Sequence, residues 1–165
     1  MIQLVTGDLT VLPFDIILHQ TNTVIRGQNK AAGFAKVLFQ RFPYCNFYRD
    51  PNACSVPGNI VVRCPPTGRS GPIIIGLNGQ TSLGKPRHEL ERNQRYNYFV
   101  LGLRNLTQWL AKNRVQNSKH IPTTIGVPFN IGCGLAGGIW SDYERALNTF
   151  ANELPSEWRV TIVKL

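Results

Sequence analysis

The stretch PFNIGCGLAGGIW, residues 128–140, indicates the fold more strongly than any other part of the sequence. It follows a short β-branched run at residues 123–127 and precedes a predicted helix from Ser141 to about Leu154, where Glu144 completes a capping-box spacing. A glycine-rich loop between a strand and a helix presents successive backbone N–H groups to an anion. It lacks the G-K-[ST] of a P-loop and follows a late strand, unlike a dinucleotide fingerprint. The pattern alone leaves phosphate binding and a tight structural loop both open.

The rest of the chain alternates short strands with helices. Strands are predicted at residues 2–5, 15–19, 59–63, 73–77, 123–127 and 159–163, and helices at residues 31–42, 88–112 and 141–154. Several strands are apolar without clean alternation, which is typical of strands covered on both faces. Residues 44–58 and 65–72 are predicted to be surface loops within the same domain. The order of elements predicts an α/β sandwich.

Length and composition narrow the class of protein. The 165 residues are 42% hydrophobic and only 16% charged, which predicts one globular domain over residues 1–165 and excludes a disordered or coiled-coil chain. The sequence has no apolar run long enough for a membrane span and begins without the basic region of a secretory signal. Its four cysteines form no C-x-x-C pair. We therefore expect reduced thiols in a cytoplasmic protein without membrane contact.

The formal net charge of +9 is concentrated in the middle of the chain. Residues 26–87 carry nine basic residues against Asp50 alone, whereas residues 1–25 carry two acids and no base. Such a field favours a polyanion, such as nucleic acid, or a phosphorylated small molecule. Solubility without any acidic partner is the alternative.

Three further segments place polar or small residues where predicted strands end. In TGDLT (residues 6–10) Asp8 is either a turn cap or an acceptor for an amino group. In HQTNT (residues 19–23) Asn22 suits sugar hydroxyls, and His19 is either a proton-transfer group or a packed residue. The AAGFA run at residues 31–35 opens a helix, whose first N–H groups favour phosphate.

Together these segments resemble the macro domain family. The matching pieces are GDLT at residues 7–10, DIILHQTN at 15–22, AGFA at 32–35, IGCGLAGG at 131–138 and the final strand at 160–163, so the resemblance spans the chain. The HQ-x-N loop, the RFP at residues 41–43 and the GCGLAGGIW loop are most similar to the branch that contains ADP-ribose-1''-phosphate phosphatases and terminal ADP-ribose glycohydrolases.

The resemblance implies a three-layer α/β/α sandwich with a central mixed sheet and an ADP-ribose site at the strand ends. Asp8 matches the acid that holds the adenine amino group, Leu9 lies beside the ring, and Asn22 matches a residue near the distal ribose. The two phosphate-facing loops it implies contain Ala32, Gly33, Phe34 and Ala35, and Gly132, Cys133, Gly134, Leu135, Ala136 and Gly137. The resemblance implies no metal and no cofactor.

Positions that carry catalysis in the family differ here. Ile139 replaces an acidic or amide residue, and Asn78 and Ala136 occupy the positions matched to a nucleophilic lysine and a late acid. The remaining catalytic candidates are His19 as acid or base and Asn22 as the group that positions water or ribose. Three functions stay open: hydrolysis of ADP-ribose-1''-phosphate or ADP-ribosyl linkages, ADP-ribose reading without turnover, and nucleic-acid binding through residues 26–87. We expect a monomer.

Overall fold

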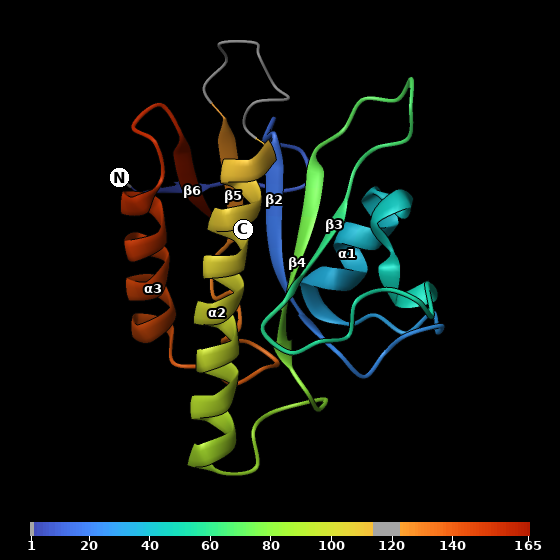
Figure 1. Cartoon of the computed structure of the whole chain (residues 1–165), viewed down its shortest axis with the longest axis vertical. Helices are drawn as coiled ribbons and strands as arrows, with labels where there is room; N and C mark the ends of the chain where they lie inside the picture. Colours follow the sequence, from blue (N-terminus) through green and yellow to red (C-terminus); the bar gives the residue numbers. More distant parts are fainter. Residues whose placement is uncertain (1, 114–122) are drawn as a thin grey trace.

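The computed structural model describes residues 2–113 and 123–165, and these residues form a six-stranded sheet with the order β1-β6-β5-β2-β4-β3 (Figure 1). Only β3 runs antiparallel to its neighbour, so the sheet is mixed as predicted. The strands are β1 Ile2–Thr6, β2 Ile16–Asn22, β3 Ile60–Arg63, β4 Ile73–Gln80, β5 Thr124–Pro128 and β6 Arg159–Lys164. The last strand of the chain lies between β1 and β5, inside the sheet.

Helices cover both faces of the sheet and complete the predicted α/β/α sandwich (Figure 1). They are α1 Gly33–Arg41, α2 Glu89–Asn113 and α3 Trp140–Glu153, with 3-10 turns η1 Pro43–Cys45 and η2 Phe47–Arg49. On one face α2 and α3 bury Phe99, Leu106 and Leu147 against the sheet. On the other face α1, η1 and η2 bury a second apolar cluster around Leu38 and Phe47.

Residues 44–58 are less exposed than the sequence analysis expects. Cys45, Phe47 and Tyr48 are buried in the cluster beneath α1, so η1 and η2 are part of the core and only the following residues form a loop. The aromatic side chains explain the difference, because burying rings of this size outweighs the turn-forming residues around them. Residues 65–72 form a loop, as predicted.

Several boundaries also differ from the prediction. Helix α3 begins at Trp140 with Ile139 as its N-cap and no side-chain cap, so Ser141 does not form the expected capping box. Strand β2 continues to Asn22 and β4 to Gln80. Both extensions are buried and paired in parallel, so polar residues that were expected in loops belong to the sheet.

All four cysteines are described and are free thiols, as predicted. No helix in the described ranges is both long enough and apolar enough to cross a membrane.

Candidate anion-binding site at the carboxyl edge of the sheet

The parallel strands bring the predicted segments to one edge of the sheet. Strands β1, β2, β4, β5 and β6 run parallel, so the loops that follow them leave from the same edge. The loop after β1 carries Asp8, the segment after β2 leads to α1, and the loop after β5 is the glycine-rich stretch. This edge is where open α/β sheets bind ligands.

The first turn of α1 offers backbone donors. Its N-cap, Ala32, has no oxygen on its side chain, and no side chain caps the helix. Gly33 adopts a φ of 57°, which a residue with a side chain reaches only with strain. The N–H groups of the first turn of any helix lack intrahelical partners, and the helix dipole makes this end positive. The predicted phosphate-facing residues Ala32, Gly33, Phe34 and Ala35 therefore lie at the N-cap and first turn of α1.

The glycine-rich loop folds back on itself between β5 and α3. The Cys133 N–H donates to the Asn130 carbonyl at 2.8 Å, and the Gly138 N–H donates to the Gly132 carbonyl at 2.9 Å. Within the described ranges no acceptor takes the N–H groups of Gly134, Leu135 or Ala136. A side chain added at Gly134 would meet open space. Three consecutive donors are thus available at an accessible turn.

The two donor segments meet. A Cβ built on Gly33 would lie 3.1 Å from Cδ1 of Leu135, so the glycine-rich loop rests against the first residue of α1. Leu135 is otherwise exposed. The first turn of α1 and the turn at Gly134 are therefore neighbours, although the two segments lie about a hundred residues apart in the sequence. Together they can surround one anionic group with backbone donors.

Two arginines of α2 hold the glycine-rich loop in place, and sequence reasoning missed both. The buried Arg95 donates to the Ala136 carbonyl at 2.9 Å and to the Gly84 carbonyl at 2.6 Å, and it pairs with Glu91 at 3.0 Å. Nε of Arg92 donates to the Gly137 carbonyl at 3.2 Å. A signal was present, because Arg95 precedes Phe99 by four residues and so lies on the buried stripe of α2.

Asp8 lies where an amino group can reach it. One carboxylate oxygen accepts from the N–H of Thr10 at 2.8 Å and from its hydroxyl at 2.7 Å. Both hydrogen bonds lower the pKa of Asp8, and the one from the Thr10 hydroxyl has the larger effect. The exposed carboxylate is therefore ionised at neutral pH. No hydrogen-bond donor among residues 2–113 and 123–165 reaches the second carboxylate oxygen. Leu9 is buried against Gly126 of β5, so only its backbone can lie beside a ligand.

His19 is placed in the core, away from the donor turns. Its side chain is 1% exposed, both ring nitrogens lack hydrogen-bond partners, and the rings of Phe39 and Phe47 pack against it at 5.6 and 5.9 Å. Burial lowers the pKa of His19 to about 3. The ring is therefore neutral at pH 7 and buried, which argues against the expected role as acid or base.

The side chain of Asn22 forms hydrogen bonds within the protein. Its side-chain oxygen accepts from the N–H groups of Val24 at 3.0 Å and Ile25 at 2.8 Å, and its amide donates to the Tyr48 hydroxyl at 3.1 Å. The side chain is buried and shapes the turn after β2. Both polar atoms of the Asn22 side chain therefore have partners within the protein, which does not support the expected role in positioning water or ribose.

The end of β4 carries amides. Asn78 is fully buried, accepts from the Thr21 hydroxyl at 2.9 Å and donates to the Cys54 carbonyl at 3.0 Å. Two positions further, Gln80 accepts from the amide of Gln20 at 3.3 Å. Oxygen Oε1 of Gln20 is buried without a partner, close to where a Cβ on Gly132 would lie. The strands predicted from the sequence end at residues 19 and 77, so the contact between Gln20 and Gln80 was not predicted.

Cys133 does not supply a nucleophile. Burial, followed by the nearby charge of Asp142, raises the pKa of its thiol to about 12. The thiol is protonated at neutral pH, and the thiolate is the reactive form. Within the glycine-rich loop Cys133 therefore contributes backbone and packing.

Comparison with known proteins agrees with this geometry at the level of the fold. No protein-family model matches the sequence, and no curated protein is similar to it. Solved structures are similar over nearly the whole chain. The macrodomain of Thermus aquaticus DarG has a TM-score of 0.72 at 23% identity, and that of Mycobacterium tuberculosis DarG has 0.75 at 22%, each match covering 99% of this chain and 97% of the other.

A Trypanosoma brucei macrodomain solved in complex with ADP-ribose is more distant, with a TM-score of 0.59 at 16% identity over 99% of this chain and 63% of the other. These similarities show that the chain has the macrodomain fold. The sequence-based expectation of that fold is confirmed.

Proposed function

We propose that this chain binds ADP-ribose, free or at the end of a larger molecule, at the carboxyl edge of its sheet. The observation that carries the proposal is the meeting of two sets of backbone donors, at the first turn of α1 and at Gly134, across the contact between Gly33 and Leu135. A diphosphate bound there gains charge-assisted hydrogen bonds without any lysine.

The adenine end of the ligand would lie toward β1. Asp8 is exposed, ionised and has one carboxylate oxygen without a protein donor, so it suits the adenine amino group. Solved macrodomains with ADP-ribose, from Trypanosoma brucei and from Oceanobacillus iheyensis, are consistent with this choice of ligand. The proposed ligand is a nucleotide sugar held along the edge from Asp8 to Gly134.

The activity that we propose is reading without turnover. Of the groups considered for catalysis, His19 is neutral and buried. The side chains of Asn22 and Asn78 form hydrogen bonds within the protein. Proton transfer needs a group within reach of the substrate and with a pKa near the working pH. Hydrolysis of ADP-ribose-1''-phosphate or of an ADP-ribosyl linkage would need another residue of this chain.

Isothermal titration calorimetry with ADP-ribose tests the proposal, with ADP and ribose 5-phosphate as partial ligands. We expect ADP-ribose to bind more tightly than either part, and to raise the melting temperature because it binds only the folded state. Incubation with ADP-ribose-1''-phosphate should release no phosphate. Absence of binding at millimolar ADP-ribose would refute the proposed ligand, and phosphate release would refute reading without turnover.

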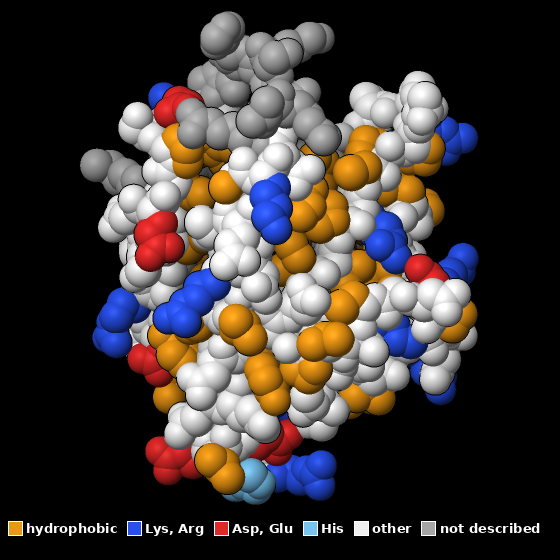
Figure 2. All heavy atoms as spheres, in the orientation of Figure 1, with side chains coloured by type: hydrophobic (Ala, Val, Ile, Leu, Met, Phe, Trp, Pro, Cys, Tyr) orange, Lys and Arg blue, Asp and Glu red, His pale blue; other side chains and the backbone are white. Residues whose placement is uncertain are grey.

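Contact with nucleic acid is a second candidate function, favoured by the surface charge. Lys and Arg side chains border the side of the molecule that carries β3 and α1 (Figure 2). Lys36 of α1, Arg49 of η2 and Arg69 of the loop after β3 are exposed and have no ion-pair partner within the described ranges. Phosphate contacts of this kind predict an affinity for single-stranded DNA that falls steeply with salt. ADP-ribose binding should depend on salt far less.

A further inference from the structure

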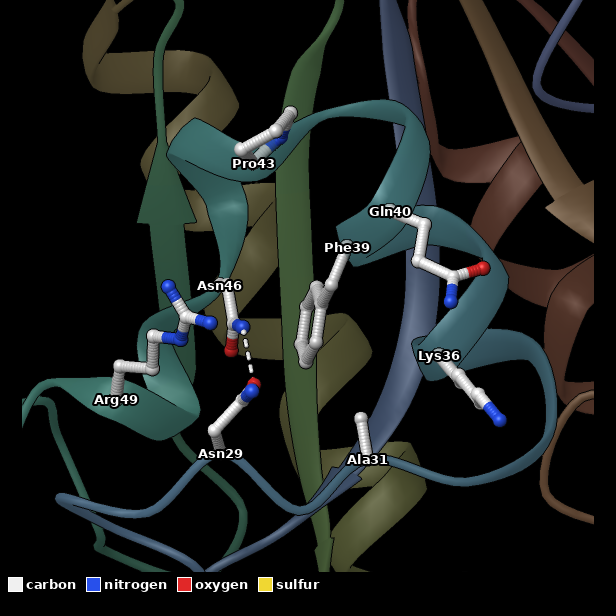
Figure 3. A pocket seen from close by; sticks show the side chains of 8 residues that line it. All are labelled: Asn29, Ala31, Lys36, Phe39, Gln40, Pro43, Asn46 and Arg49. Carbon is white, nitrogen blue, oxygen red and sulfur yellow. Dashed lines mark hydrogen bonds between the residues drawn. The ribbon is translucent and has the colours of Figure 1, made fainter.

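A pocket beside α1 shares no lining residue with the donor turns at residues 32–35 and 134–136 of the proposed ADP-ribose site. It has a volume of about 390 Å³ and lies between the segment before α1, the outer face of α1, and the turns η1 and η2 (Figure 3). Its lining residues are Asn29, Ala31, Lys36, Phe39, Gln40, Pro43, Asn46 and Arg49. This volume is at the small end of the range of ligand pockets, which suits a sugar-sized molecule.

The lining is cationic. Lys36 lies on the α1 side and Arg49 on the η2 side, and no aspartate or glutamate lines the pocket (Figure 3). Neither cation has an ion-pair or hydrogen-bond partner among the described residues. The two side chains do not converge, because Lys36 points away from Arg49 and the Phe39 ring lies between them in this view (Figure 3). The unpaired guanidinium of Arg49 is therefore the donor that a phosphate would meet, and Lys36 adds positive charge at the rim.

The remaining polar atoms require a ligand that also donates. Oxygen Oδ1 of Asn46 is buried and has no hydrogen-bond partner, while its amide donates to Asn29 at 3.3 Å. A buried acceptor without a donor costs free energy, which a ligand hydroxyl would recover. The ring of Phe39 lies beside this pair and offers an apolar surface to sugar C–H groups (Figure 3). A bare phosphate leaves most of the volume and this ring unused.

We propose that this pocket binds a phosphorylated sugar, with the phosphate on Arg49 and a hydroxyl donating to Asn46. The proposal does not depend on ADP-ribose binding, because the pocket shares none of the donors at Gly33 or Gly134. The same chemistry is found in a free sugar phosphate and in the phosphorylated end of a nucleic acid strand. The test below includes both sources.

The full chain is titrated with three ligands: ribose 5-phosphate, inorganic phosphate, and a short single-stranded oligonucleotide with a terminal phosphate. Calorimetry measures each affinity, and the chemical shifts of the backbone amides, recorded by NMR, locate the bound ligand. We expect ribose 5-phosphate to bind more tightly than inorganic phosphate and to shift the backbone amides of residues 43–49, which lie outside the ADP-ribose site. Tighter binding of the oligonucleotide would identify the strand end as the source, and tighter binding of ribose 5-phosphate would identify a free metabolite. No shifts in residues 43–49 with either ligand would overturn the proposal.

Substitutions assign the site. Arg49→Gln should weaken ribose 5-phosphate binding about tenfold, the effect of one lost charge-assisted hydrogen bond, and Lys36→Gln should weaken it less. Arg145→Gln, on α3 across the sheet, is the matched control and should leave the affinity within about twofold. In Gly134→Glu, which blocks the ADP-ribose site, ribose 5-phosphate should still shift the backbone amides of residues 43–49, and this separates the pocket from the ADP-ribose site. Equal weakening by Arg145→Gln would show a general charge effect and overturn the proposal.

Discussion

The side chain of Leu135 rests on Gly33, with Cδ1 of Leu135 3.1 Å from where a Cβ on Gly33 would lie. This contact joins the glycine-rich loop after β5 to the first residue of α1. It brings two sets of backbone N–H donors together, and neither segment alone can surround a diphosphate. The geometry of the site therefore depends on a glycine at position 33.

Gly33→Ala should weaken ADP-ribose binding, because the new methyl group pushes Leu135 away from α1. The backbone at position 33 has a φ of 57°, so an alanine there adds strain of about 1 kcal/mol to the folded state. Gly68→Ala is the matched control, since Gly68 has a φ of +81° and open space around it. Urea unfolding should show a similar loss of stability in both variants, and calorimetry should show weaker binding in Gly33→Ala alone. Equal affinities in the two variants would contradict the role of the contact.

Asp8→Asn should lower the affinity for ADP-ribose about tenfold, because a neutral amide oxygen accepts from the adenine amino group less strongly than a carboxylate does. Ribose 5-phosphate lacks adenine and should bind the variant as it binds the native protein. Parallel titrations with the two ligands measure the difference. If Asp8→Asn affected both ligands alike, the assignment of the adenine end to β1 would be wrong.

Arg95→Met should destabilise the fold by about 3 kcal/mol, because it leaves the Ala136 and Gly84 carbonyls without their donor and Glu91 without its buried partner. Denaturant unfolding measures the loss. Arg104→Met, an exposed arginine on the same helix, should change stability by less than about 0.5 kcal/mol. A loss in Arg95→Met no larger than in Arg104→Met would show that the loop does not need this anchor.

His19 predicts a dependence of stability on pH. Its pKa is about 3 when folded, against an ordinary value of 6.5, so between these values the unfolded chain binds a proton that the folded chain does not. The free energy of unfolding should therefore fall as the pH is lowered from 6.5 toward 3, by up to about 1.4 kcal/mol per pH unit from this residue.

His19→Leu should remove that part of the pH dependence and should retain ADP-ribose binding, since the ring lies in the core. Unfolding measured at several pH values compares the slopes, and His88→Gln at the exposed start of α2 is the control. An unchanged slope in His19→Leu would show that His19 is not the group responsible.

The sequence predicts the fold more fully than the site. Alternation of β-branched runs with amphipathic helices is a periodic signal, and it located six strands, three helices and the glycine-rich loop. The ends of β2 and β4 were missed because Asn22 and Asn78 are polar in a buried setting. Their hydrogen-bond partners, Tyr48, Thr21 and Cys54, come from distant parts of the chain. No local sequence pattern reveals such partners. The burial of His19 likewise depends on Phe39 and Phe47, which are distant in the sequence, so the sequence alone could not distinguish a packed histidine from a functional one.

Packing across the sheet likewise hides the anchors of the site. From the sequence alone, Arg95 is expected to be an exposed charge on α2. Its hydrogen bonds to the carbonyls of Ala136 and Gly84 become visible only in the folded structure. The contact between Leu135 and Gly33 joins residues about a hundred positions apart, and periodicity carries no information at that range.

The most direct test of the central claim is calorimetry of ADP-ribose with the native chain, Gly134→Glu and Gly134→Gln. Gly134 has open space around it and its φ lies outside the left-handed region, so both variants should fold with an unchanged melting temperature. We predict that Gly134→Glu loses binding by at least about a hundredfold through repulsion of the diphosphate, and that Gly134→Gln loses less. Native affinity in Gly134→Glu would contradict the claim that this loop holds the diphosphate.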